Sequence, residues 1–306
     1  MLKTVHPHWE AEMRAHRRIA VLGAHLGLRL CMGPLLHAAE AKPVVPPGAQ
    51  IVGPYTPALQ VGNLLYVSGQ GARDAKGELA PTLAGQIRQS LNNVKSVVEA
   101  AGLTMEHLVY SQVYVTDTSA YSELPSVWSE FFKAGGPALQ ALGVTAMPVG
   151  TPVEINAVAV TDILMKRAVQ LAGTTNTGSP PDAVVAGDRL FFSSCFGLDP
   201  EGKVPADSAQ QTQLALDRME VILKAAGIGP GHVVFVNPYI TDALNAGQMN
   251  QEYARMNRIY AGYFKAPFPA RTTVQQRPSV ERKQNEREQW PDLEQISLIA
   301  VKSQNK

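Results

Sequence analysis

Two similar segments decide the fold, Gly62-Asn-Leu-Leu-Tyr-Val-Ser68 and Gly187-Asp-Arg-Leu-Phe-Phe-Ser193. From Gly62 to Gly187 the offset is 125 residues, and at this offset residues 62–117 align with 187–242 without a gap. Of the 56 aligned positions, 16 are identical, whereas shared composition alone would give about 3 or 4. The period is too long for a solenoid repeat. The sequence therefore predicts two copies of one whole domain.

Each copy has the same expected order of elements. A Gly-Asn or Gly-Asp turn precedes a short β run, and a helix follows whose apolar residues recur every three or four positions. The first helix is expected between a Thr82 cap and Gly102, and its counterpart between Asp207 or Ser208 and Gly227. The remaining expected elements are strands at 108–116 and 233–241, helices near 119–133 and 246–264, and closing strands at 153–160 and 295–301.

This order of elements predicts an α+β fold. Each domain should have a mainly antiparallel sheet with two helices packed on one of its faces. The other face of such a sheet must be buried by something, which favours a homo-oligomer.

The composition is that of an ordinary soluble globular protein, with 306 residues of which 45% are hydrophobic. Lys and Arg number 27 and Asp and Glu 26, and this balance argues against a nucleic-acid partner. Two cysteines, Cys31 and Cys195, are too few for a disulfide framework or a Cys-rich zinc site. No histidine pair has metal-ligand spacing, and no apolar run is long enough for a stable membrane span. We therefore expect no metal and no membrane anchor.

Residues 1–50 have the pattern of a signal-peptide-like leader followed by a Pro-rich linker. A basic start precedes an apolar stretch, and Ala39-Glu-Ala41 fits a small-residue cleavage site. This pattern favours an exported, periplasmic protein over a cytoplasmic one. The alternative is a poorly ordered extension, or an upstream start site that is not used. The two domains are then expected at 51–163 and 168–303.

The motifs of both copies resemble the RidA/YjgF family of reactive-intermediate imine deaminases, also described as endoribonuclease L-PSP. The first copy contributes Gly53-Pro-Tyr55, Tyr66-Val-Ser-Gly-Gln70 and Val153-Glu-Ile-Asn-Ala-Val-Ala159. The second contributes Phe268-Pro-Ala-Arg-Thr-Thr-Val274 and Ile296-Ser-Leu-Ile-Ala-Val301. The resemblance implies tandem chorismate-mutase-like (RidA) domains, packed as trimeric domain rings with ligand clefts between neighbours. It also implies hydrolysis of 2-imino or enamino acids to 2-keto acids and ammonia without a cofactor.

The resemblance assigns site residues unevenly to the two copies. In the first copy it implies catalytic roles for Glu154 and Tyr55 and substrate binding by Gly69 and Gln70. In the second it implies substrate binding by Arg271, which suits a carboxylate, and by Asn257. The counterparts have changed: Leu139 stands at the arginine position, Pro125 at the asparagine position, Ser194 and Cys195 at the Gly-Gln positions, and Gln295 at the glutamate position.

Two functions follow as hypotheses. The first is a hydrolytic deaminase for a small imino or enamino acid, or a related amine or amide, with parts of the site contributed across an interface between domains. The second is a non-catalytic protein that binds small carboxylates or serves as a scaffold. A ribonuclease ranks third, because the chain lacks a basic strip studded with aromatic residues. Cys195 is either a nucleophile or a small buried apolar residue. The segment 280–290 is a solvated hairpin or a cover over a cleft.

Overall fold

The computed structural model describes residues 40–51, 53–133, 135–171, 178–205, 207–241, 246–277 and 293–302. The expected leader before residue 40 and the segment 280–290 lie outside the described residues. The predictions of an export signal and of a hairpin or cleft cover therefore stay predictions. Among the residues described, no helix has the length and apolar character needed to cross a membrane.

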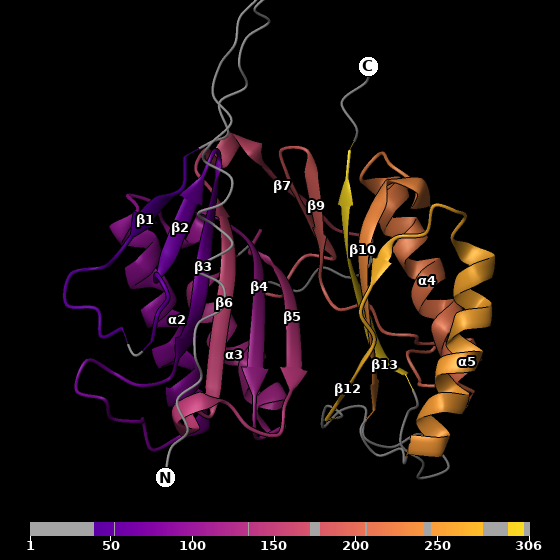
Figure 1. Ribbon diagram of the computed structural model, residues 1–306, viewed down its shortest axis with the longest axis horizontal. Coiled ribbons are helices and arrows are strands. Elements are labelled where there is room, and N and C mark those ends of the chain that lie inside the picture. The colour runs from indigo at the N-terminus through magenta and orange to yellow at the C-terminus, as the bar shows by residue number, and fades with distance from the viewer. Residues whose placement is uncertain are drawn as a thin grey trace, which may run out of the picture. The chain divides into compact units, whose positions relative to one another are not determined.

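The first repeat contains a six-stranded sheet in the order β1-β2-β3-β6-β4-β5 (Figure 1). Its strands are β1 (Lys42–Val44), β2 (Ala58–Val61), β3 (Leu64–Gly71), β4 (Leu108–Val115), β5 (Ala138–Gly143) and β6 (Val153–Val160). Neighbouring strands are antiparallel except β4 and β5, which are parallel. Helices α2 (Leu83–Ala100) and α3 (Ala120–Phe131) pack on one face, and their core includes Ile87, Leu124 and Trp128.

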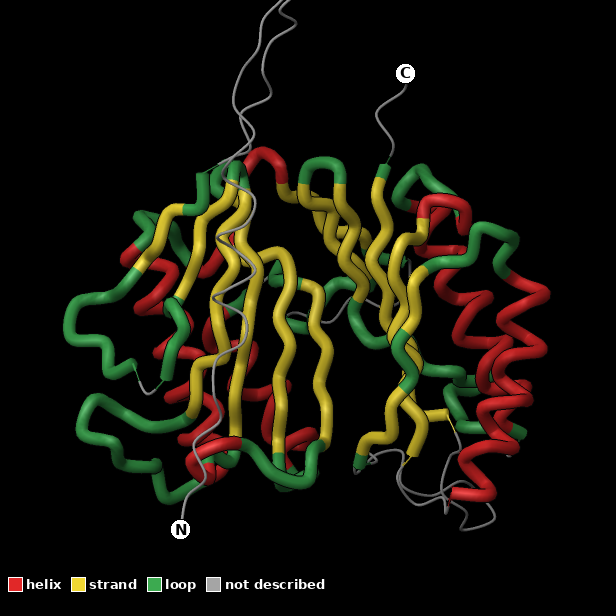
Figure 2. The backbone as a smooth tube through the Cα atoms, viewed as in Figure 1, coloured by secondary structure: helices red, strands yellow, loops and turns green. Residues whose placement is uncertain are grey.

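The second repeat has a matching sheet in the order β11-β10-β13-β9-β8-β7, with β12 also paired to β10. Its strands are β7 (Lys166–Val169), β8 (Ala183–Ala186), β9 (Arg189–Phe192), β10 (Val233–Thr241), β11 (Ala270–Arg271), β12 (Val274–Gln276) and β13 (Leu293–Val301). Helices α4 (Ser208–Ala225) and α5 (Ala246–Tyr263) lie together on one side of it (Figure 2). The predicted α+β class, present twice, is confirmed.

The predicted helix ends are also observed. The Thr82 hydroxyl accepts a bond from the Gly85 amide at 3.1 Å, and the Asp207 carboxylate accepts one from the Ala209 amide at 2.8 Å. Each satisfies an amide that has no partner within the helix. Gly102 and Gly227, which follow α2 and α4, have φ of +75° and +82°, a conformation that favours glycine.

The sheets begin earlier than the sequence patterns indicate. Strand β1 lies in the segment assigned above to the linker, and β7 begins at Lys166, two residues before the expected start of the second domain. Both are short edge strands, and a proline such as Pro43 is tolerated at a sheet edge because it removes only one ladder donor. Composition therefore marked this segment as a linker although it pairs with β2.

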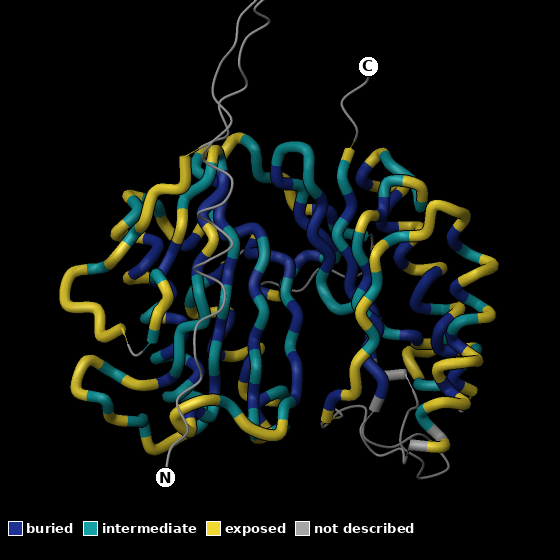
Figure 3. The backbone as a smooth tube through the Cα atoms, viewed as in Figure 1, coloured by how far each residue is buried: buried dark blue, intermediate teal, exposed yellow. Residues whose placement is uncertain are grey.

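Buried positions form three clusters. Two lie between each sheet and its helices, and a third contains residues of both repeats, among them Val109 and Ala138 from the first and Val184 and Phe191 from the second. Strands and inner helix faces are buried, whereas most turns are exposed (Figure 3). The third cluster covers part of the sheet face that the helices leave open.

Candidate functional site

Two of the predicted substrate-binding residues, Arg271 and Asn257, line the same pocket of the second repeat. The cavity measures about 560 Å³ and lies between α5 and the segment that leads into β11. Met249, Tyr253, Tyr260 and Phe268 line it as well. The pocket thus combines aromatic walls, an amide and one cation, which suits a small anionic ligand.

The Arg271 guanidinium is oriented by two aromatic rings. Its Nη2 donates a hydrogen bond to the Tyr253 hydroxyl at 2.9 Å, and its Cζ lies 4.6 Å from the centre of the Tyr260 ring. Burial raises the pKa of Tyr260, although Arg271 opposes this shift. Stacking on aromatic faces holds the planar guanidinium in place, and this group can bind a carboxylate through two parallel hydrogen bonds.

Neither Tyr253 nor Tyr260 was predicted from the sequence as a site residue. They lie four residues before and three residues after Asn257 on α5, so all three share one face of the helix. The helical spacing of Tyr253, Asn257 and Tyr260 in the sequence could therefore have identified both tyrosines as neighbours of Asn257.

The first repeat holds a second group of predicted residues, at a bulge in β3. Val67 pairs with Ala157 and Gln70 with Ile155, so one extra residue is inserted at Ser68-Gly69. A Cβ at Gly69 would lie 2.7 Å from Cδ of Glu154, which shows that the Glu154 side chain covers the Gly69 backbone. Burial raises the pKa of the Glu154 carboxyl. Because residue 69 has no side chain, the Glu154 carboxylate can lie directly against the Gly69 backbone.

The two other predicted residues of the first repeat have different surroundings. The Gln70 side-chain amide donates to the carbonyls of Ser68 and Gly69, at 3.0 and 3.3 Å, so it folds back onto the bulge. Tyr55 is exposed in the turn before β2. Gln70 therefore stiffens the bulge, while Tyr55 is presented at the surface.

Within the described part of the chain, the two groups do not share a pocket. Every described residue that lines the Arg271 pocket belongs to the second repeat, whereas Gly69 and Glu154 belong to the first. Among the described residues no three His, Cys, Asp or Glu side chains cluster as metal ligands.

Cys195, at the position of Gln70 in the second repeat, lies in the hydrophobic core. It is buried, and its Sγ lies 3.4 Å from the carbonyl oxygen of Ala215 as a donor. This placement matches the small buried apolar residue rather than an accessible nucleophile.

Substituting Gly69 by alanine should lower activity while leaving the stability of the fold nearly unchanged. The new methyl group displaces the Glu154 carboxylate, which is the flexible end of a side chain and can move aside. We expect a loss of at least about tenfold in any activity that uses Glu154, with a stability change below about 1 kcal/mol. Paired activity and urea-unfolding measurements check this, and unchanged activity with a fully folded protein would contradict it. Gly77→Asn, in an exposed turn with a positive φ, serves as the control.

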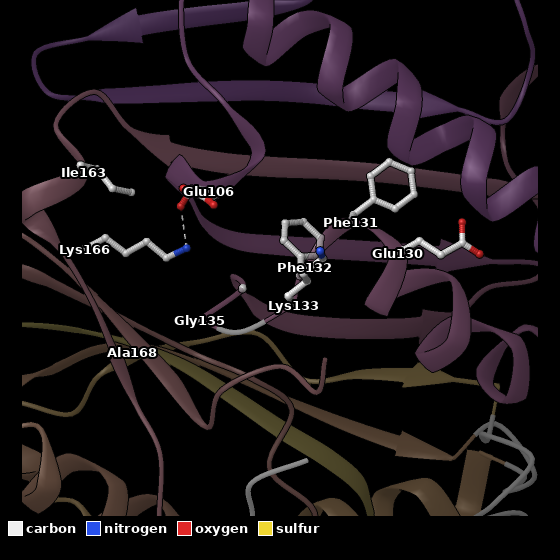
Figure 4. A pocket seen from close by; sticks show the side chains of 10 residues that line it. Glu106, Glu130, Phe131, Phe132, Lys133, Gly135, Ile163, Lys166 and Ala168 are labelled. Carbon is white, nitrogen blue, oxygen red and sulfur yellow. Dashed lines mark hydrogen bonds between the residues drawn. The ribbon is translucent and has the colours of Figure 1, made fainter. Parts of the chain in front are cut away.

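A second cavity, of about 590 Å³, contains none of the predicted residues (Figure 4). It lies where the connection into β7 passes α3, and Glu106, Phe132 and Lys166 are among its lining residues. The Lys166 ammonium donates to the Glu106 carbonyl oxygen at 2.7 Å. Burial lowers the pKa of Lys166 to about 8, and Glu106 opposes this shift.

Acylation of Lys166 should therefore follow a titration with its midpoint near pH 8. Only the neutral amine reacts, and burial favours that form. Lys166 also loses its proton at a lower pH in the folded state than in the unfolded state. The free energy of unfolding should therefore rise with pH from about 8 to 10.5. Peptide mass spectrometry after brief treatment with acetic anhydride measures the midpoint. The urea-unfolded protein is the control, with an expected midpoint of about 10.4; equal midpoints would contradict the shift.

Comparison with known proteins places these features in a family. The Endoribonuclease L-PSP family model matches residues 48–161 and 177–280. A RutC family protein of Aquifex aeolicus is 37% identical over 112 residues, which cover 36% of this chain and 90% of the relative. The 2-iminobutanoate/2-iminopropanoate deaminase of Escherichia coli K12 is 37% identical over 113 residues, covering 36% of this chain and 88% of the relative.

Among solved structures, RidA from an Antarctic Psychrobacter is 33% identical, with 39% of this chain and 98% of that chain covered and a TM-score of 0.38. The two matches of the family model agree with the internal repeat and with the two sheets. The chain therefore belongs to the Endoribonuclease L-PSP family and contains two tandem domains of it.

Proposed function

We propose that the protein is a hydrolytic deaminase for small 2-imino or enamino acids. The observation that carries this proposal is the Arg271 pocket, in which an oriented guanidinium and Asn257 face a cavity of suitable size for a small carboxylate. Two relatives, from Escherichia coli and Bos taurus, bear the name 2-iminobutanoate/2-iminopropanoate deaminase, which supports the same chemistry.

The proposed reaction adds water across the C=N bond. Arg271 binds the substrate carboxylate, and Glu154, contributed across an interface between domains, accepts a hydrogen bond from the attacking water and receives its proton. The proton passes to the nitrogen, and the resulting carbinolamine breaks its C–N bond to give a 2-keto acid and ammonia. The raised pKa of Glu154 makes it a stronger base than an exposed glutamate.

The test supplies 2-iminopropanoate generated in situ and follows its decay in the presence and absence of the purified protein. Faster decay, with stoichiometric 2-keto acid and ammonia, supports the proposal. Glu154→Gln should lose the acceleration, and the exposed Arg258→Ala, on the same helix as Asn257, should keep it. Decay at the uncatalysed rate with the folded wild-type protein would overturn the proposal.

The second candidate is a non-catalytic carboxylate-binding protein. It is favoured by one observation, namely that all described lining residues of the Arg271 pocket belong to the second repeat, while Glu154 lies in the first repeat. Thermal stabilisation by 2-oxobutanoate, lost in Arg271→Ala and unaccompanied by imine hydrolysis, would identify this function.

A further inference from the structure

The cavity beside Lys166 is separate from the Arg271 pocket. Its volume of about 590 Å³ is sufficient for a small ligand. Its described lining residues come from the end of α3 and the turn after it, from the short helices η1 (Met105–His107) and η3 (Ile163–Met165), and from β7. The two cavities have no described lining residue in common. The Lys166 cavity is therefore a second candidate site.

The backbone that carries Lys166 is fixed at the edge of this cavity. The Gly187 amide donates to the Met165 carbonyl oxygen at 2.9 Å, and Lys166 itself pairs with Ala186 at the start of β7. The helix η3, which precedes it, is capped by the Asp162 side chain. The Lys166 side chain therefore starts from a defined position, as a reactive group requires.

The Lys166 amine is held by a hydrogen bond rather than by an ion pair. Its Nζ donates to the Glu106 carbonyl oxygen at 2.7 Å, and no ion pair of the described residues includes Lys166. In Figure 4 the side chain extends from β7 toward the side of the cavity where Phe132 and Lys133 lie. A neutral amine can donate one hydrogen to this carbonyl and keep its lone pair available for a ligand.

Burial keeps part of Lys166 in the neutral form. It lowers the pKa of the amine to about 8, although the Glu106 carboxylate opposes this shift. The other charged residues that line the cavity are Lys133 and Glu130, and Glu130 is bound by Arg88 through two hydrogen bonds of 2.6 and 2.5 Å. Lys166 is therefore a nucleophile near neutral pH, whereas a lysine with the usual pKa of about 10.4 is almost fully protonated there.

Lys133 gives the cavity a second cation. Its side chain is exposed, and it belongs to none of the ion pairs found in the described part of the chain. Phe131 and Phe132, the two residues before it, add apolar surface to the lining. A ligand that fits has a carboxylate for Lys133, a small apolar end and an electrophilic carbon for Lys166. Small 2-keto acids have all three features.

The reactive lysine belongs to the segment between the two repeats. At the offset of 125 residues, β1 and β7 pair in the same register with β2 and β8. Ala41 is therefore the equivalent of Lys166 in the first repeat, and its methyl group cannot react with a carbonyl compound. The Lys166 cavity is thus a property of this tandem chain rather than of the domain that is repeated.

We propose that Lys166 captures a small 2-keto acid as a Schiff base and that Lys133 binds the carboxylate. The lone pair of the amine attacks the keto carbon, and an amine proton moves to the former carbonyl oxygen to give a carbinolamine. The C–O bond then breaks, the hydroxyl leaves as water with the remaining amine proton, and a C=N bond joins Lys166 to the ligand. The step needs no oxidant or reductant, and hydrolysis reverses it.

Reductive trapping tests this capture. The whole chain is incubated at pH 8 with pyruvate and sodium cyanoborohydride, which reduces the Schiff base to a stable carboxyethyl-lysine. Peptide mass spectrometry then measures the label on each lysine. Lys166 should be labelled at least about tenfold faster than the exposed Lys76 and Lys224. Labelling of Lys166 at or below the rate of these two lysines would overturn the proposal.

A variant and a second carbonyl compound test the role of Lys133. Propanal has a reactive carbonyl but no carboxylate. Lys133→Gln should therefore slow the labelling of Lys166 by pyruvate about fivefold and leave its labelling by propanal unchanged. Lys224→Gln, which removes an exposed lysine of α4, is the matched control and should label at Lys166 as wild type does. Equal pyruvate labelling in wild type and Lys133→Gln would overturn the assignment of Lys133.

The result does not depend on the proposed deaminase function, because labelling is measured without turnover. Arg271→Ala should be labelled at Lys166 at the wild-type rate, since the described linings of the two cavities do not overlap. Loss of the Lys166 label in Arg271→Ala would show that capture needs the Arg271 pocket and would overturn a separate site. Small 2-keto acids are also products of the proposed reaction, so the Lys166 cavity would bind the product of that function.

Discussion

Arg271→Ala is expected to lower kcat/KM for 2-iminopropanoate by about 10²- to 10³-fold. Hydrogen bonds to a charged partner contribute about 1.5–3 kcal/mol each, and a guanidinium that holds a carboxylate makes two of them. Arg271 lines the pocket and is already oriented by Tyr253 and Tyr260, so its loss removes a prepared anchor. Initial rates over a range of substrate concentrations give kcat/KM directly.

Two further variants separate charge from geometry at this position. Arg271→Lys keeps a cation but has a single donor group instead of a planar fork, so an intermediate loss of about tenfold is expected. Tyr260→Leu removes the ring on which the guanidinium stacks and should raise KM more than it lowers kcat. Wild-type rates in Arg271→Ala would show that the substrate carboxylate is held elsewhere.

Gly197→Ala is expected to destabilise the second repeat by about 3 kcal/mol, through overpacking. A Cβ at this position would lie 2.7 Å from the Cα of Gln211, which belongs to the backbone of α4 and cannot rotate away. The equivalent residue in the first repeat is Ala72, which is fully buried, so the first repeat accommodates a methyl group at the position where the second repeat has no space for one.

Urea unfolding followed by circular dichroism measures this loss, and hydrogen exchange of peptides from α4 assigns it to the second repeat. Gly231→Ala is the control, because a Cβ there meets no atom within 4 Å, and its effect should remain within about 0.5 kcal/mol. An unfolding midpoint equal to that of wild type would mean that α4 can shift without loss.

Much of the fold was accessible from the sequence because its signals are local or periodic. The α2 and α4 helices follow from apolar residues at spacings of three and four, and their ends follow from Thr82, Asp207 and the glycines after them. Strand β1 was missed since three residues with a proline carry too little pattern, and only pairing with β2 makes them a strand.

The site was predictable in part. Arg271 and Asn257 were both identified from motifs, and the structure places them in one pocket. The contact between Gly69 and Glu154 was not predictable, because 85 residues separate them along the chain and a strand bulge brings them together. The sequence also showed that each repeat retains a different half of the family's site, but not which halves face each other.

The sequence by itself determined that one domain is present twice, because the repeat can be detected by aligning the chain with itself. The same alignment located the residues that differ between the two copies. Only the tertiary structure decided that Leu139, Ser194 and Gln295 lie where the two repeats meet, that Arg271 lines a pocket of the second repeat, and that Glu154 covers Gly69 in the first. The physical reason is that packing and hydrogen bonding between distant segments determine which residues lie next to one another where domains meet. The order of residues in the sequence does not show which surfaces will be in contact.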